Sequence, residues 1–138
     1  MVAVTGGLTS LDLSNNLLCG VTIFGSGTYK AEGITAIAEA LRVNGALTAL
    51  NLSSNRLEDE GVSAVCKAIQ SNMETKLASL NFKDNGIGSV GSKSVAAMVA
   101  VTGALTECDL SYNGMGKKGK ASIYFAVQGK RGFKLQLL

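Results

Sequence analysis

Two glycine-rich stretches have a spacing that could bind phosphate. Gly86–Gly91 (GIGSVG) and Gly114–Gly119 (GMGKKG) both read G-x-G-x-x-G, which in dinucleotide-binding proteins lets the backbone approach a pyrophosphate at a helix start. The second also approaches a nucleotide-binding loop, but Ala121 stands where a serine or threonine would hold magnesium. The corresponding stretch Arg56–Gly61 lacks the first two glycines. We therefore expect no cofactor, and keep a simple anion site beside Lys117, Lys118 and Lys120 as an alternative.

Other residue types that carry chemistry are sparse. The chain has no histidine and three cysteines, Cys19, Cys66 and Cys108, without a C-x-x-C pair. We therefore expect no metal site, no catalytic residue and no enzymatic activity. Few, scattered cysteines indicate a reducing compartment, cytoplasmic or nuclear, and we expect a cytoplasmic protein. No apolar run approaches the roughly 18 residues of a membrane span, so we expect no membrane partner.

Charge is distributed unevenly along the chain. Residues 110–138 hold six of the thirteen basic residues and none of the ten acidic ones, which leaves residues 1–109 with a net charge of −3. A basic end can attract nucleic acid, but no aromatic residues alternate with the basic ones as in specific RNA binders. We therefore interpret the end as a solvated basic cap and expect no specific nucleic-acid partner.

The whole chain is organised by a motif, L-x-x-L-x-L-x-x-N, that occurs four times, starting at Leu8, Leu47, Leu77 and Leu105. Its apolar positions alternate as on a short strand with one buried face. The asparagine that follows suits a turn, because its amide can bond to backbone groups nearby. We expect these asparagines to form a buried ladder between stacked repeats: Asn16, Asn55, Asn85 and Asn113.

A helix follows each turn. A glycine precedes apolar residues at plus four and plus eight in every unit, which is one stripe of a helix; the glycines are Gly33, Gly61, Gly91 and Gly119. We predict helices over about 31–43, 59–73, 89–102 and 117–128, and a final strand near 133–138. Asp59 and Glu60 fall at the start of the second helix, where negative charge suits the helix dipole.

This pattern resembles the leucine-rich repeat family, in its helix-containing, ribonuclease-inhibitor-like subtype with a period near 28 residues. The resemblance implies an α/β right-handed solenoid, or horseshoe, with parallel strands on the concave face and helices on the convex face. It implies a single domain over residues 1–138, with about four repeats and a terminal strand. Family members mostly bind other proteins, so it also implies a protein partner.

Two segments depart from the regular repeat. Residues 1–7 resemble the end of a helix whose start is missing, so an open solenoid end could self-associate. Residues 17–30 carry an insertion, centred on 18–28, that either caps the open core, through Ile23 and Phe24, or contacts a partner through Phe24 and Tyr29.

The outward strand positions supply the remaining candidates. We predict a non-catalytic protein-interaction module that uses its concave face and strand-end loops. The alternatives are a solvated face, and a structural or self-associating scaffold element from a longer array. The predicted partner-binding residues are Asp12, Asn51, Asn81, Lys83, Asp109 and Tyr112, with Phe24 and Tyr29 from the insertion.

Overall fold

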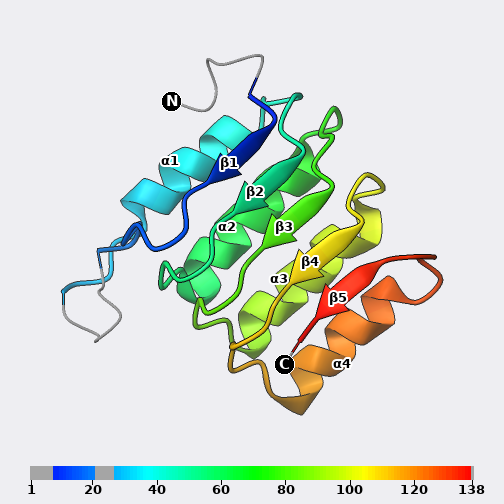
Figure 1. The fold of residues 1–138 in the computed structure, drawn as a ribbon. Coiled ribbons are helices and arrows are strands. Elements are labelled where there is room, and N and C mark those ends of the chain that lie inside the picture. The colour runs from blue at the N-terminus through cyan, green and yellow to red at the C-terminus, as the bar shows by residue number, and fades with distance from the viewer. Residues whose placement is uncertain (1–7, 21–26, 138) are drawn as a thin grey trace.

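The computed structural model describes residues 8–20 and 27–137, which alternate strand and helix. The strands pair in parallel in the order β1-β2-β3-β4-β5. In Figure 1 this sheet lies in front of a layer of helices that follows the same order. The elements are β1 Ser10–Asp12, α1 Glu32–Leu41, β2 Ala49–Asn51, α2 Glu58–Ser71, β3 Ser79–Asn81, α3 Ser89–Val101, β4 Glu107–Asp109, α4 Gly116–Val127 and β5 Lys134–Gln136.

The strand register follows the motif directly. The middle residues Leu11, Leu50, Leu80, Cys108 and Leu135 lie side by side across the sheet. Leu50, Leu80 and Cys108 are buried against the helix layer, while their neighbours along each strand are partly exposed. Cys108 is therefore the buried hydrophobic residue that its place in the motif predicts.

The core lies between the sheet and the helices. Phe82 and Ile87 are fully buried there, as are Val65 and Val95, the residues four positions after the helix glycine. Burying one such side chain contributes roughly 1.5–3 kcal/mol, so the stacked layers are held mainly by aliphatic contacts.

The helix glycines allow neighbouring helices to approach closely. A Cβ at Gly91 would lie 2.6 Å from Asp59 Oδ1, and one at Gly119 would lie 2.7 Å from Ser92 Oγ. Both contacts come from the preceding repeat. Gly91 and Gly119 are thus required by stacking between repeats rather than by ligand binding.

The predicted asparagine ladder is present. Asn85 Oδ1 accepts hydrogen bonds from the amides of Asn55 (3.0 Å) and Leu57 (3.3 Å) in the preceding repeat. Asn85 Nδ2 donates to the carbonyls of Leu52, Phe82 and Lys83. These bonds satisfy backbone groups that the turn would otherwise leave without partners.

Burial of the ladder is confined to its middle. Asn55 and Asn85 are fully buried, whereas Asn113 is half-buried and Asn16 is exposed. The expectation that all four are buried is wrong for Asn16, because no described residue precedes its repeat in the sheet.

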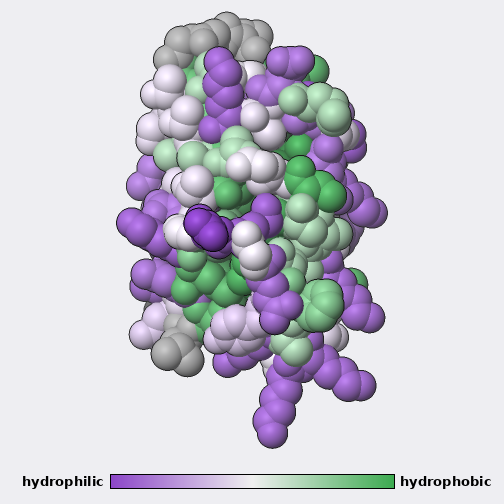
Figure 2. All heavy atoms as spheres, turned by 90° about the vertical axis from the view of Figure 1, so that its right-hand side faces the viewer, coloured by the Kyte–Doolittle hydropathy of each residue, from purple (hydrophilic) through white to green (hydrophobic). Residues whose placement is uncertain are grey.

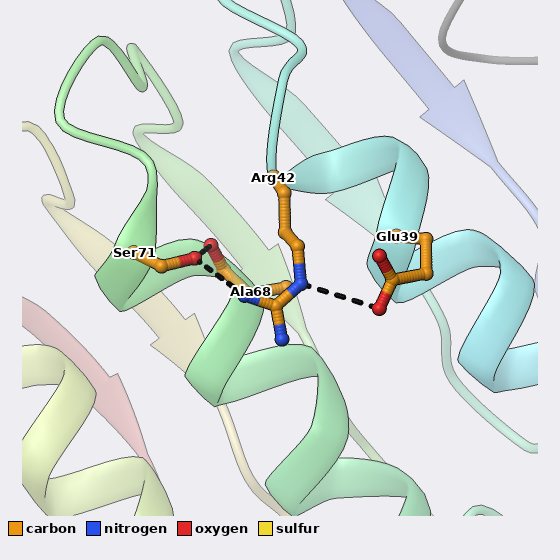
Figure 3. Close-up of polar contacts among 4 residues, drawn as sticks. All are labelled: Glu39, Arg42, Ala68 and Ser71. Carbon is orange, nitrogen blue, oxygen red and sulfur yellow. Dashed lines mark hydrogen bonds and ion pairs between the residues drawn. The ribbon is translucent and has the colours of Figure 1, made fainter.

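Polar contacts also link the helices on their outer side. Arg42, just after α1, forms an ion pair with Glu39 at 3.3 Å and donates to Ser71 Oγ of α2 at 3.1 Å, as Figure 3 shows. Ser71 in turn donates to the carbonyl of Ala68. The contact between Arg42 and Glu39 is solvent-exposed, and such pairs contribute little to stability.

The helix limits agree with the sequence predictions to within two residues. The predicted helix end at residues 1–7 and the capping by Ile23 and Phe24 lie outside the described residues. The single-domain assignment over 1–138 stays a prediction.

Candidate protein-binding surface on the sheet

Four of the predicted binding residues form one row across the sheet. Asp12, Asn51, Asn81 and Asp109 are in register at the ends of β1 to β4. Asp12 is exposed and the other three are half-buried. The structure thus brings together residues that lie up to 97 positions apart in the chain.

Each member of this row also has a role in its own turn. Asp12 Oδ1 accepts a hydrogen bond from the amide of Ser14, and Asp109 Oδ1 accepts one from the amide of Ser111, each at 2.9 Å. Asn51 and Asn81 bond in the same way to the amide two residues on. The side-chain and backbone hydrogen bonds from Ser14 lower the pKa of Asp12. Sequence reasoning missed this turn-forming role, although the Asp or Asn that ends each of these strands was its signal.

Two shallow hollows lie on the sheet. One, of about 250 Å³, spans β1 to β3 and is lined by Asp12 and Asn51 among others. The other, of about 200 Å³, spans β3 to β5. It holds Glu107, Asp109 and Lys134, and Ser79 Oγ donates to Glu107 Oε1 at 2.7 Å within it. This second hollow carries charges of both signs.

An aromatic and a basic side chain contact each other just beyond the ends of β3 and β4. Lys83 Nζ lies 5.1 Å from the centre of the Tyr112 ring, and 71% of Tyr112 is exposed. Such cation–π contacts are worth roughly 0.5–1 kcal/mol at exposed sites. Lys83 therefore restrains the exposed ring of Tyr112, which follows β4, one of the strands that line the second hollow.

Tyr112 has a left-handed backbone conformation, as do Leu17, Arg56 and Glu58 among the other large residues. Its φ is +57°, and the equivalent residues of the other turns, Asn15, Ser54 and Asp84, have φ of +55° to +56°. Short polar side chains such as Asn and Asp tolerate this left-handed conformation, whereas a bulky one is disfavoured by roughly 1–2 kcal/mol. The fourth turn thus holds a tyrosine where the fold favours a small polar residue.

The two insertion candidates have different outcomes. Phe24 lies outside the described residues. Tyr29 is half-buried, and its hydroxyl donates to the carbonyl of Leu57. Burial raises the pKa of the Tyr29 phenol. Tyr29 thus serves the contact between the first two repeats, and binding of a partner by Tyr29 and Phe24 stays a prediction.

In the first G-x-G-x-x-G stretch, the carboxylate of Asp59 occupies the position that a bound anion would take. Asp59 Oδ1 accepts hydrogen bonds from the amides of Gly88 (2.7 Å) and Gly91 (3.0 Å), at the start of α3. The Glu58 carboxylate lies where a side chain at Gly86 would project. A helix start attracts anions, and here a carboxylate of the preceding repeat occupies it. Asp59 was predicted to suit the dipole of its own helix, and its contact with the next helix was missed.

The second glycine stretch differs from the first. A Cβ at Gly114 or Gly116 would meet nothing within 4 Å. Lys117 and Lys118 are exposed there, and Lys120 is partly exposed. The simple anion site stays a prediction.

Two further findings concern function classes. Among residues 8–20 and 27–137, no group of three or more His, Cys, Asp or Glu residues could hold a metal ion. Over the same residues, no helix is long and apolar enough to cross a membrane.

Comparison with known proteins finds similarity to leucine-rich repeat proteins. One leucine-rich repeat family model matches residues 46–66 and 75–96, and a second matches residues 7–27. The mouse (Mus musculus) ribonuclease inhibitor is 41% identical over 73 residues, which is 53% of this chain and 16% of that protein. Mouse NACHT, LRR and PYD domains-containing protein 12 is 35% identical over 83 residues, 60% of this chain and 8% of that protein. The matches thus span a small part of both relatives.

A solved structure confirms the fold along nearly the whole chain. The leiomodin-1 actin-binding site 2 structure superposes with a TM-score of 0.77 at 20% identity, and the match covers 99% of this chain and 75% of that one. With the motif in four copies, the parallel sheet and the buried asparagine ladder, these similarities show a leucine-rich repeat fold and support a protein of the ribonuclease-inhibitor-like type.

Proposed function

We propose that this chain is a protein-interaction module that binds its partner through the C-terminal half of the concave sheet face. Tyr112 carries the proposal. Its ring is exposed, is restrained by Lys83, and sits on a backbone conformation that disfavours a bulky residue. A residue held at a cost to stability suggests a role outside the fold. Tyrosine is also one of the side chains enriched at the energetic centres of protein interfaces.

The surroundings of Tyr112 support recognition of a protein surface rather than of a small molecule. The hollow across β3 to β5 is open and shallow, and it mixes Glu107 and Asp109 with Lys134. Small-molecule sites are concave and mostly apolar, whereas charges of both signs beside an aromatic anchor suit a protein contact. The ribonuclease inhibitor, by its name, acts on a protein enzyme.

Capture of partners by an immobilised chain tests the proposal. Tyr112→Ala and Lys83→Glu are each compared with Phe125→Ala, which removes another exposed ring from α4. We expect the first two variants to lose partners that wild type and Phe125→Ala retain, with unchanged circular dichroism. Equal capture by all four proteins would contradict the proposal.

A further inference from the structure

One set of positions marks the outward side of the helix layer. The residues one before, six after and ten after each helix glycine are exposed in all four repeats. These spacings place them on a single line along a helix, which we call the outer line. A following repeat leaves these positions exposed in the first three repeats, so a further repeat would not cover them in α4 either. The outer line consists of Glu32, Glu39 and Val43, then Glu60, Lys67 and Ser71, then Val90, Ala97 and Val101, and finally Lys118, Phe125 and Gly129.

The outer line of α3 is apolar although it faces solvent. Val90 is 62% exposed and Val101 is 66% exposed, and the exposed Ala97 lies between them. The solvent side of a surface helix normally carries polar residues, as α1 does with Glu32 and Glu39. Single exposed apolar residues are ordinary, but an aligned stripe rimmed by polar residues marks an interaction surface.

A shallow hollow of about 200 Å³ lies at the C-terminal end of this stripe. Val101 lines it together with the buried Ile69 and with Met73, from the loop after α2, which is 90% exposed. The charges of Glu74 and Lys76 in the same loop cancel. The hollow thus extends the apolar stripe towards α2 and offers a place for one apolar side chain of a partner.

Basic side chains surround the stripe. Lys93 is on α3 itself, Lys67 is on the outer line of α2, and Lys117 and Lys118 are in the first turn of α4. All four are exposed, and Figure 2, from the side of β5 and α4, shows long hydrophilic side chains projecting beside hydrophobic ones. Neither α3 nor α4 contains Asp or Glu, and Glu60 is the acidic residue on the outer line of α2. The surface therefore complements an acidic ligand.

The form of the stripe favours a helix as its ligand. The backbone groups of α3 bond within the helix itself, so a ligand cannot pair with them as a strand. An amphipathic helix instead brings apolar side chains at spacings of three and four residues. Val90 and Val101 are eleven residues apart, roughly 17 Å along α3, so about three turns of a ligand helix match the stripe.

The rest of the outer line disfavours broader anionic ligands. A membrane lying flat on the helix layer would bring anionic headgroups towards Glu32, Glu39 and Glu60 as well as towards the lysines. Duplex DNA would contact the lysines through its phosphates and would leave the apolar stripe unused. A single acidic helix along α3 avoids α1 and uses both the stripe and the lysines.

We propose that the outer line of α3 binds an acidic amphipathic helix of a protein partner. Apolar side chains of that helix contact Val90, Ala97 and Val101, and one of them enters the hollow beside Met73. Its carboxylates lie towards Lys93 and the lysines of α4. This surface lies on the helix layer, is distinct from the sheet surface of the proposed function, and does not depend on it.

Fluorescence anisotropy with a labelled peptide tests the proposal. The probe is a helix of about 20 residues with leucines spaced three and four apart and glutamates beside them. We expect saturable binding to wild type that Ala97→Glu weakens at least about tenfold, because its carboxylate then lies among the glutamates. Ala36→Glu makes the same change at an exposed site on α1 and should bind like wild type. Circular dichroism checks that the variants are folded.

Two comparisons separate this surface from others. Tyr112→Ala should bind the probe like wild type, so the proposed function and this inference can fail independently. A peptide of the same composition without helical periodicity, and a peptide with lysine in place of every glutamate, should both bind at least about tenfold more weakly.

Several results would overturn the proposal. They include a lack of saturable binding to wild type, equal weakening by Ala97→Glu and Ala36→Glu, and undiminished binding of either control peptide. If wild type sediments as an oligomer that the probe disperses, the occupant is instead a second copy of this chain. If phosphatidylserine vesicles displace the probe completely, the ligand is instead a lipid surface.

Discussion

Replacing Asp59 with alanine should destabilise the array at one junction. Asp59 Oδ1 accepts from two amides at the start of α3, at 2.7 and 3.0 Å. Hydrogen bonds to charged groups contribute about 1.5–3 kcal/mol each, but the side chain is only half-buried, and loss of a helix N-cap costs about 0.5–2 kcal/mol. We expect Asp59→Ala to lower the free energy of unfolding by about 2 kcal/mol.

Urea denaturation followed by circular dichroism measures this loss. With a denaturant slope of about 1.5 kcal/mol per molar, the midpoint should fall by about 1.3 M. The control is Glu60→Ala, which removes an exposed carboxylate from the same turn of α2 and should cost below about 0.5 kcal/mol. Asp59→Asn keeps an acceptor oxygen and should fall between the two.

A second readout separates capping of α3 from a general effect of charge. Without the Asp59 carboxylate, the start of α3 becomes an anion site. Replacing chloride with sulfate at matched ionic strength should therefore raise the free energy of unfolding of Asp59→Ala. The same replacement should raise that of wild type less. Equal losses in Asp59→Ala and Glu60→Ala, with equal responses to sulfate, would refute the assignment of Asp59 as the cap of α3.

Three further substitutions test other contacts by the same denaturation assay. Asn85→Ala leaves two amides and three carbonyls without their bonds and should cost about 3–4 kcal/mol, against below about 1 kcal/mol for the exposed Asn16→Ala; equal losses would contradict the ladder. Gly119→Ala forces a Cβ to within 2.7 Å of Ser92 Oγ and should cost about 1–3 kcal/mol, whereas Gly103→Ala, with nothing within 4 Å, should be nearly neutral. Burial raises the pKa of the Cys108 thiol from 9.0 to about 12, so the unfolded chain loses this proton first and stability should fall as pH rises between those values, by up to about 1.4 kcal/mol per unit; Cys108→Val should remove that part of the dependence.

Strand and helix positions could be predicted because each repeat contains its own regular spacing of apolar residues. The spacing of Leu47, Leu50 and Leu52 requires a strand with one buried face, and the glycine with apolar residues four and eight positions later requires a helix. Four copies in register also allowed the repeats to be stacked without a structure. The ladder followed from Asn55 and Asn85 occupying the same place in adjacent turns.

Contacts between repeats were harder to predict. The distance between Asp59 and Gly88 depends on how closely α2 and α3 stack, which no pattern within a single helix reports. The turn bonds of Asp12 and Asp109 were missed for a different reason, since their outward position was interpreted as availability to a partner. The strain at Tyr112 is a backbone property, and only comparison with Ser54 and Asp84 in the structure reveals it.

The combined stability and binding of Tyr112→Asn tests the central claim most directly. Asparagine suits the left-handed turn, as Asn15 shows in the first repeat, so the substitution should raise the free energy of unfolding by about 0.5–1 kcal/mol while removing the exposed ring. If Tyr112 is held there for recognition, the variant should be more stable than wild type and should lose its captured partners. A variant that captures the same partners as wild type, whatever its stability, would contradict the account.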